Sequence, residues 1–224
     1  MAVTWTPPPG YLMCEALQER AGRLPVRQQL VAALGAIQRC FPFFERSTTR
    51  FPARAAFRAA AEASLRFAWE QPGPLAERAP QIREQSRRLA VELRGFVPTG
   101  PEDRILDGDD SWITVTFGNL AEHLDLIGYP DPAAYTRATV GAAANLVSSW
   151  YATGEMLHDR DPALEGQTGS SGYLLELATL ARHLEWLERR ELTPALVDLV
   201  RQDSIRTGDT LLAIVDEWLP PEAT

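Results

Sequence analysis

The chain has 224 residues, of which 45% are hydrophobic and 23% are charged, the mixture of a soluble globular protein. A chain of this length buries about 70% of its unfolded surface, so it needs neither disulfides nor a metal to stabilise its core. The composition excludes a mainly disordered, a collagen-like or a disulfide-framework protein.

Charge is divided unevenly along the sequence. The 22 basic residues are all arginines, and with 30 acids the net charge is −8. Residues 1–98 hold 14 arginines and 8 acids, whereas residues 99–224 hold 8 arginines and 22 acids. An acidic half of this kind repels phosphate backbones and attracts basic partners. The alternative is that the two halves face each other within one fold.

The cysteines and the apolar runs indicate in which cellular compartment the protein is expected. Cys14 and Cys40 lie in apolar, helix-like stretches without a C-x-x-C motif, which is typical of free buried thiols in a reducing cytoplasm. The N-terminus lacks a basic region and an apolar core, so we expect no signal peptide and a cytoplasmic location. The longest uncharged run, Ala138 to Gly154, is shorter than the roughly 18 residues of a membrane span.

Prolines mark the first predicted helices. We expect residues 1–24 to form a Pro-rich lead-in with a short helix over 11–22. A second helix begins at Pro25, because proline at the first helical position lacks only an N–H that has no partner there. Pro42 should end or kink this helix. Its apolar residues recur at spacings of four and three, as Val26, Leu30, Leu34, Ile37, Phe41 and Phe44.

Two further helices are predicted before residue 98, beginning at Pro52 and Pro80. The segment from Pro98 to Asp110 is the longest apparent loop, and it is acidic. This loop, residues 98–110, is the only candidate seam between domains.

The segment after this loop has two interpretations. The run Ile-Thr-Val-Thr-Phe by itself is typical of a strand. Apolar residues, however, repeat at 4-3-4-3 from Ile113 to Ile127, and this longer period favours a helix. Asp110 or Ser111 is expected to cap it through a side-chain oxygen.

The next predicted helix begins with the cap Asp131 and with Pro132 and reaches about His158. Its middle, residues 138–144, consists mostly of small side chains, which let neighbouring backbones approach closely. We therefore expect a central, heavily packed helix.

Two more helices complete the chain. A glycine-rich loop over residues 166–172 precedes a helix whose apolar residues repeat at 4-3-4-3, and Thr193 and Pro194 open the last one. The sequence therefore predicts a single all-α domain over residues 25–219, a bundle of about seven or eight helices.

Four residues are candidate metal ligands. Glu155 and His158 lie at i and i+3 on one helix face, a pair that a carboxylate-bridged di-metal bundle needs twice, and no second copy occurs. His123 and His183 lie on two other predicted helices, and three converging histidines would suit zinc with an open site. The charged neighbours of His183 favour a surface face for it instead. A metal-dependent helical enzyme is therefore the alternative function, and the main prediction is that there is no cofactor.

Other patterns in the sequence do not match the kinds of binding site that they resemble. The run Asp107 to Ser111 lacks the glycine and glutamate of a calcium loop at positions six and twelve. The loop over residues 166–172 has no lysine and follows no strand, so it is not a P-loop or a Rossmann fingerprint. Arginines spaced by four from Arg46 to Arg58 are too few for nucleic-acid binding by an acidic chain. We expect them to be solvated or to pair with the acidic half.

Several short motifs occur in a familiar order. They are Leu30-Val-Ala-Ala-Leu34, Cys40-Phe-Pro42-Phe-Phe44, Phe67-Ala-Trp69-Glu70, Asp109-Asp110, Ala121-Glu-His123-Leu, Ala138-Thr-Val140-Gly, Glu188-Arg-Arg-Glu191-Leu, Leu199-Val-Arg201 and Gly208-Asp-Thr-Leu. Their order and spacing, over roughly residues 27–215, resemble those of the YjaG-like family of bacterial all-helical proteins of unknown function. The resemblance implies a helical bundle and carries over no catalytic residue.

Charge and the lack of a catalytic motif together favour a non-enzymatic cytoplasmic interaction protein. Its concrete form is an inhibitor or immunity protein that covers a basic protein partner with its acidic half, since complementary charge raises the association rate. A loop presents its side chains to a partner. The candidate binding residues are Asp103, Asp107, Asp109, Asp110 and Trp112.

Overall fold

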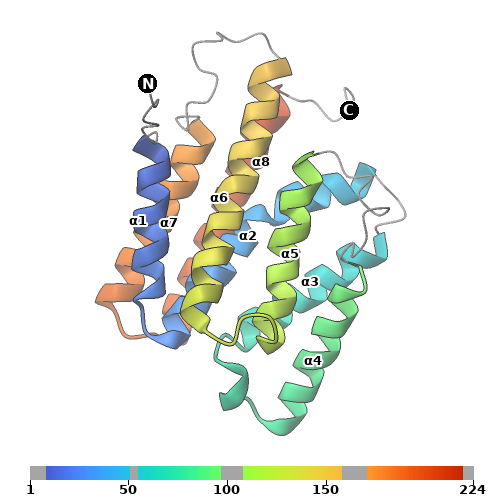
Figure 1. Cartoon of the computed structure of the whole chain (residues 1–224), viewed down its shortest axis with the longest axis vertical. Coiled ribbons are helices and arrows are strands. Elements are labelled where there is room, and N and C mark those ends of the chain that lie inside the picture. Colours follow the sequence, from blue (N-terminus) through green and yellow to red (C-terminus); the bar gives the residue numbers. More distant parts are fainter. Residues whose placement is uncertain (1–8, 51–54, 97–107, 158–170, 219–224) are drawn as a thin grey trace, which may run out of the picture.

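The structure, a computed structural model, describes residues 9–50, 55–96, 108–157 and 171–218. Within these ranges it is an all-α bundle of eight α-helices with no strand, as the sequence predicts (Figure 1). The helices are α1 (Pro9–Gly22), α2 (Val26–Arg50), α3 (Ala55–Glu70), α4 (Pro80–Arg94), α5 (Gly108–Asp125), α6 (Pro132–Leu157), α7 (Ser171–Arg189) and α8 (Pro194–Trp218), with a 3₁₀ turn, η2 (Leu75–Glu77), between α3 and α4.

The helices form one packed unit in which α2 and α6 contact most of the others. Figure 1 shows α1 and α7 side by side at one edge and α3, α4 and α5 together at the other. The N-termini of α1 and α7 lie at the same end, since the Tyr173 hydroxyl donates to the Gly10 carbonyl and Arg20 pairs with Glu188 at the other end. None of the helices in the described ranges combines the length and hydropathy needed to cross a bilayer.

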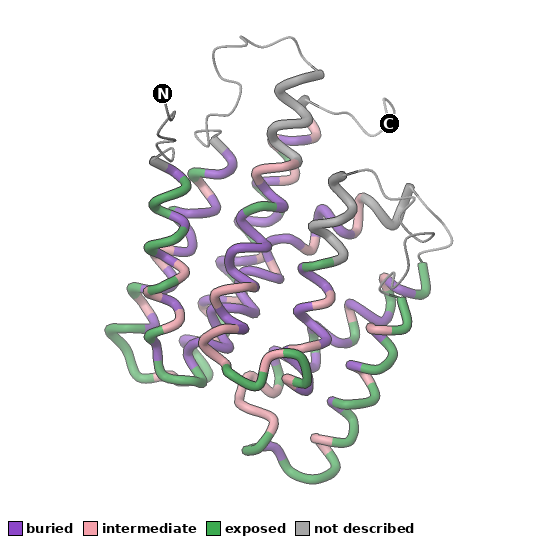
Figure 2. The backbone as a smooth tube through the Cα atoms, viewed as in Figure 1, coloured by how far each residue is buried: buried purple, intermediate pink, exposed green. Residues whose placement is uncertain are grey.

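The core lies along α2 and α6 (Figure 2). The prediction that α6 is central is confirmed, because residues 140–144 are buried and α6 packs against α1, α2, α5, α7 and α8. The side chains of Cys14 and Cys40 are both buried and free, as expected. Burial raises the pKa of the Cys40 thiol well above its ordinary value, as is typical of a thiol that packs in a core.

Several predicted helix starts are confirmed. Pro80, Pro132 and Pro194 are each the first residue of a helix. Asp131 accepts a hydrogen bond from the Ala133 N–H at 2.9 Å, which satisfies a donor that has no partner within the helix. These local signals suffice because each acts within one turn of chain.

The start of α5 differs from the prediction. The helix is present instead of the alternative strand, but it begins at Gly108. Asp110 and Ser111 therefore lie inside its first turn, so the prediction that they precede it as caps is wrong. A carboxylate inside the first turn is still favourable, because the helix dipole places partial positive charge there.

The helix α2 does not end at Pro42. It continues to Arg50 with the proline inside it, so of the two predicted outcomes, an end or a kink, the end does not occur. Proline removes one backbone hydrogen bond, but the segment beyond it buries Phe43 and Phe44 completely. The Phe44 ring stacks on Phe117 of α5 with centroids 4.1 Å apart. Burial of these aromatic rings offsets the lost bond.

Candidate functional site

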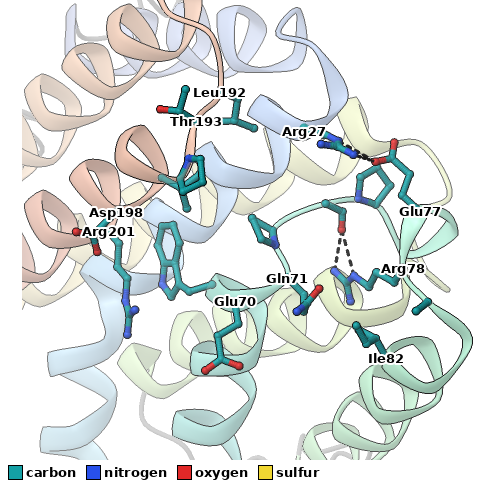
Figure 3. Close-up of a pocket in the computed structure, with 17 residues that line it drawn as sticks. Arg27, Glu70, Gln71, Glu77, Arg78, Ile82, Leu192, Thr193, Asp198 and Arg201 are labelled. Carbon is teal, nitrogen blue, oxygen red and sulfur yellow. Dashed lines mark hydrogen bonds and ion pairs between the residues drawn. The ribbon is translucent and has the colours of Figure 1, made fainter.

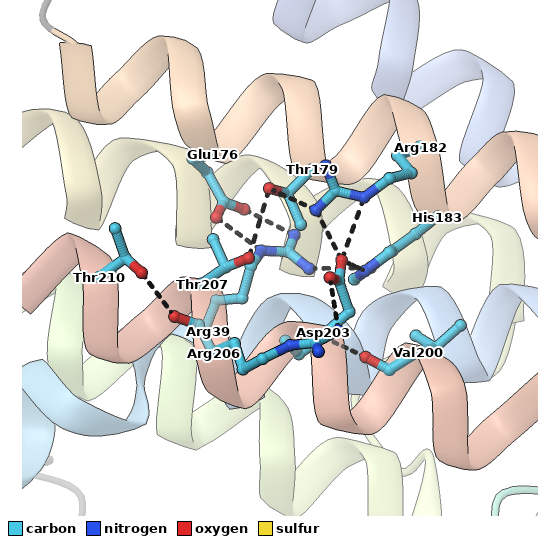
Figure 4. A network of polar contacts seen from close by, with 11 residues as sticks. Arg39, Glu176, Thr179, Arg182, His183, Val200, Asp203, Arg206, Thr207 and Thr210 are labelled. Carbon is cyan, nitrogen blue, oxygen red and sulfur yellow. Dashed lines mark hydrogen bonds and ion pairs between the residues drawn. The ribbon is translucent and has the colours of Figure 1, made fainter.

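Arg39 and Glu176 form an ion pair inside the bundle (Figure 4). Nε and Nη2 of Arg39, from α2, each donate at 2.6 Å to one carboxylate oxygen of Glu176, from α7. The two side chains are 0% and 1% exposed. Taking both charges out of water is costly, and this two-point geometry is what makes the buried pair tolerable.

His183 and Asp203 extend the pair toward α8. Nη1 of Arg39 lies 3.2 Å from Nδ1 of His183, and Nε2 of His183 lies 2.9 Å from Oδ2 of Asp203. A guanidinium can only donate, so Nδ1 accepts and Nε2 carries the proton that goes to Asp203. Arg182 donates to the same carboxylate at 2.6 Å and is 41% exposed, so the network reaches the surface there.

The expected surface position of His183 is wrong, because this side chain is fully buried. Its neighbours Arg182 and Glu185 lie farther out on α7, as adjacent positions on a helix point in different directions. His183 lies seven residues after Glu176, on the face that α7 turns to α2. Its role is to connect Arg39 to Asp203 inside the core.

His123 lies in a separate buried site on α5. Its Nδ1 is 3.0 Å from the hydroxyl of Tyr135 on α6, and its Nε2 has no hydrogen-bond partner among the described residues. Burial, with the nearby charge of Arg78, lowers the pKa of His123 to about 3. Burial also raises the pKa of the Tyr135 hydroxyl well above its usual value.

Because these two histidines are buried and neutral, we expect the free energy of unfolding to fall strongly in acid. Burial lowers the pKa of His183 to about 4 and that of His123 to about 3, from 6.5. At pH 5 both stay neutral in the folded protein while the unfolded chain takes up their protons. Each should therefore reduce the free energy of unfolding by about 2 kcal/mol between pH 7.5 and pH 5. Urea unfolding at the two pH values measures this loss.

Single substitutions identify the groups responsible. In H183Q and in H123Q, the drop between pH 7.5 and pH 5 should be about half that of the unaltered protein. If either variant keeps the full drop, the corresponding histidine is not held neutral by the fold.

The residues predicted to bind a partner lie around the start of α5. Asp103 and Asp107 are outside the described residues. Asp109 and Asp110 are in the first turn of α5, and Trp112 follows them on the same helix. The side chains of these three also lie outside the described part of the structure.

The four candidate metal ligands do not come together in the described part of the chain. His123 and His183 bind different partners, Tyr135 and Asp203, in separate buried sites. Glu155 belongs to α6, with its side chain outside the described part, and His158 is outside the described residues. Among the described side chains, no group of three or more His, Cys, Asp or Glu has the arrangement of a metal site.

Arginines of the first half pair with acids of the second half. This is the alternative interpretation of the uneven charge, and it applies to four arginines in the described residues. The pairs are Arg20–Glu188, Arg39–Glu176, Arg46–Asp216, Arg94–Glu122 and Arg94–Asp125. Arg58 differs, because it pairs with Glu45 and Glu62 of its own half.

A pocket of about 580 Å³ opens between the end of α3 and the start of α8; we call it the α3–α8 pocket (Figure 3). The loop over residues 71–74 forms one wall, and the first turns of α8 form another. Trp69 lines it, and its indole N–H donates to Oε1 of Gln38 at 2.9 Å. The apolar lining is Trp69, Pro72, Pro74, Ile82, Leu192, Pro194 and Val197.

Three arginines line this pocket in different states. Arg27 is exposed and donates to Oε2 of Glu77 at 2.7 Å. Arg78 is 6% exposed and donates to the Gly73 carbonyl at 3.0 Å, yet no described carboxylate pairs with it, and burial lowers its pKa to about 10. The Nε of Arg201 is buried without a hydrogen-bond partner among the described residues.

The sequence patterns did not identify the charged side chains of the pocket as a site. Glu70 and Arg78 come from one part of the chain and Asp198 and Arg201 from another, more than 100 residues later, and no spacing in the sequence relates the two parts. Only the prolines that flank these segments marked the turns that bring them together.

Comparisons with protein-family models, with curated proteins and with solved structures gave no match. An inference about function therefore depends on the residues and geometry described above.

Proposed function

We propose that the chain is a non-enzymatic interaction protein, an inhibitor or immunity protein that binds a basic protein partner. The proposed contact is the acidic segment, defined as residues 102–110. Five acids and one arginine fall within these nine residues, the densest run of acid in the chain. This concentration is the observation that carries the proposal, because a dense charge of one sign attracts an oppositely charged surface.

Most of the acids of the second half whose side chains the structure describes already serve the fold. Eleven of the acids in residues 115–216 have side chains that the structure describes, and seven of these eleven form ion pairs with arginines within the protein. These are Glu122, Asp125, Glu176, Glu185, Glu188, Asp203 and Asp216. A partner drawn to the acidic half as a whole would compete with these arginines, which favours the acidic segment as the point of contact.

The helix α5, whose first three residues are the last three of the acidic segment, is fixed in the core. Phe117, Leu120, Ala121 and Leu124 of α5 are each 0% exposed. A contact built on the start of such a helix loses less conformational freedom on binding than one on a free chain. This supports Asp109 and Asp110 as anchor points of the proposed contact.

Neutralising the segment tests the proposal. A variant with Asp103, Asp107, Asp109 and Asp110 changed to Asn should associate about tenfold more slowly at low salt with the basic protein that the unaltered chain captures from its host. The difference should shrink at about 300 mM salt, where exposed charges are screened. Association rates measured by biolayer interferometry give this comparison.

A matched control removes the same charge elsewhere. The variant E84Q/E92Q/E191Q/D209N neutralises four exposed acids outside the acidic segment. It should associate within about twofold of the unaltered chain, because distant charges act weakly at a given contact. Equal slowing by both variants would mean that net charge alone matters, and no slowing in either would remove the acidic segment as the contact.

A further inference from the structure

The α3–α8 pocket is lined by two arginines, Arg78 and Arg201, that form no ion pair with a described carboxylate. From this we propose that it binds a small organic anion, a carboxylate or phosphate attached to a flat apolar group. The inference does not depend on the acidic segment or on a protein partner, since the pocket lies between other helices.

The size and stiffness of the pocket suit a small molecule. Its volume of about 580 Å³ falls in the usual range of ligand sites, roughly 300–1,000 Å³. Pro72, Pro74 and Pro194 fix the backbone of two of its walls. A wall of fixed backbone keeps its shape before the ligand arrives, which lowers the entropy lost on binding.

Arg201 is the group expected to touch the anion. Its Nε is buried and has no acceptor among the described residues, although a buried N–H without a partner is unfavourable. The residue extends from α8 into the pocket (Figure 3). That Nε is closed to solvent, so a carboxylate or phosphate would bind at the part of the guanidinium that lines the pocket, and guanidinium matches both groups in geometry.

Arg78 and the start of α8 add to the positive field. The N–H groups of Arg78 donate to Ser86 and to the carbonyls of Gly73 and Leu124, so its hydrogen bonds are satisfied while its charge is not. Figure 3 shows it across the pocket from Arg201. The first turn of α8, beginning at Pro194, lines the same space and contributes partial positive charge.

The other lining groups define the rest of the ligand. Trp69, Leu192 and Val197 offer an apolar surface for a flat ring. Glu70 and Asp198 are exposed, and no described arginine pairs with either of them. A cation would bind near these two acids, whereas an anion would bind at Arg201. The charge preference of the pocket can therefore be tested directly.

Three probes of one shape separate these cases. Naphthalene-2-carboxylate, naphthalene-2-carboxamide and 2-naphthylmethylammonium differ chiefly in charge. In ligand-observed NMR titrations the carboxylate should bind with a Kd of about 1 mM or below, and the carboxamide should bind at least about tenfold more weakly. Equal binding of the carboxamide, stronger binding of the ammonium, or no carboxylate binding at about 5 mM would each overturn the proposal.

Three single variants locate the site. R201Q should weaken carboxylate binding about tenfold, and D198N should strengthen it about threefold by removing a nearby repulsion. R87Q removes an exposed arginine outside the pocket and should change nothing. Because Asp198 is exposed, D198N keeps the test valid even if R201Q folds poorly. Carboxylate binding that is unchanged in both R201Q and D198N would contradict the assignment.

Discussion

Replacing Glu176 with alanine is expected to lower the free energy of unfolding by about 3–5 kcal/mol. The substitution leaves Arg39 charged at 0% exposure, with two donors that lose their acceptors at 2.6 Å. Arg39 also contacts His183, so the change reaches the polar network that joins α2, α7 and α8. Urea unfolding at pH 7.5, followed by circular dichroism, measures the loss.

Two controls separate a buried pair from ion pairs in general. The exposed pair Arg88–Glu84 spans one turn of α4, and E84A should cost only about 0.3–0.5 kcal/mol. The double variant R39M/E176L removes both buried charges and should recover most of the stability that E176A loses. If E176A costs no more than E84A, the buried pair does not hold the helices as described.

The second large effect is expected at Gly208, where α8 crosses α2. A Cβ atom there would lie 2.8 Å from the carbonyl oxygen of Arg39 and 3.2 Å from its Cα. Both atoms belong to the backbone, so the helices must separate to admit even a methyl group. G208A should therefore reduce the free energy of unfolding by about 3 kcal/mol, although alanine is the better helix former.

Gly118 of α5 provides the matched control for this substitution. A Cβ atom at that position would meet nothing within 4 Å. G118A should therefore stabilise the protein by about 0.5–1 kcal/mol, through helix propensity and the reduced freedom of the unfolded chain. Urea unfolding of both variants side by side decides the matter, and a similar effect at the two glycines would contradict the close crossing of α2 and α8.

The helices themselves were predictable from the sequence. Prolines at 80, 132 and 194 and the 4-3-4-3 leucine pattern of α7 act within a few turns of chain, so they can be read without knowing the fold. The sequence did not decide whether the helix ends at Pro42, because the outcome depended on the burial of residues far apart in the chain. The rings of Phe44 and Phe117 stabilise the helix beyond it, and they are far apart in sequence.

The buried polar network was missed, although the sequence contained a signal for it. Residues 30–44 contain a single charged residue, Arg39, and residues 173–181 contain a single one, Glu176. One lone charge of each sign within two apolar helix faces is consistent with a buried pair. The pairing also requires that α2 and α7 lie side by side with Arg39 opposite Glu176. This depends on the tertiary structure, and the periodicity of the sequence does not reveal it.

The uneven charge had two interpretations, and the described residues favour internal pairing for much of it. Arg20, Arg46 and Arg94 bind acids of the second half. Sequence alone did not decide this, because the choice depends on which helix faces meet. The proposed contact is therefore placed on the acidic segment, the densest run of acids in the sequence, rather than on the acidic half as a whole.

Capture of a partner from lysate of the native host, at about 50 mM and about 300 mM salt, tests the proposed function most directly. With the unaltered chain as bait and mass spectrometry as readout, we expect one basic protein in nearly equal amount at low salt. Much less of it should remain at high salt. Recovery of no basic protein, or of one whose amount is independent of salt, would contradict the proposal.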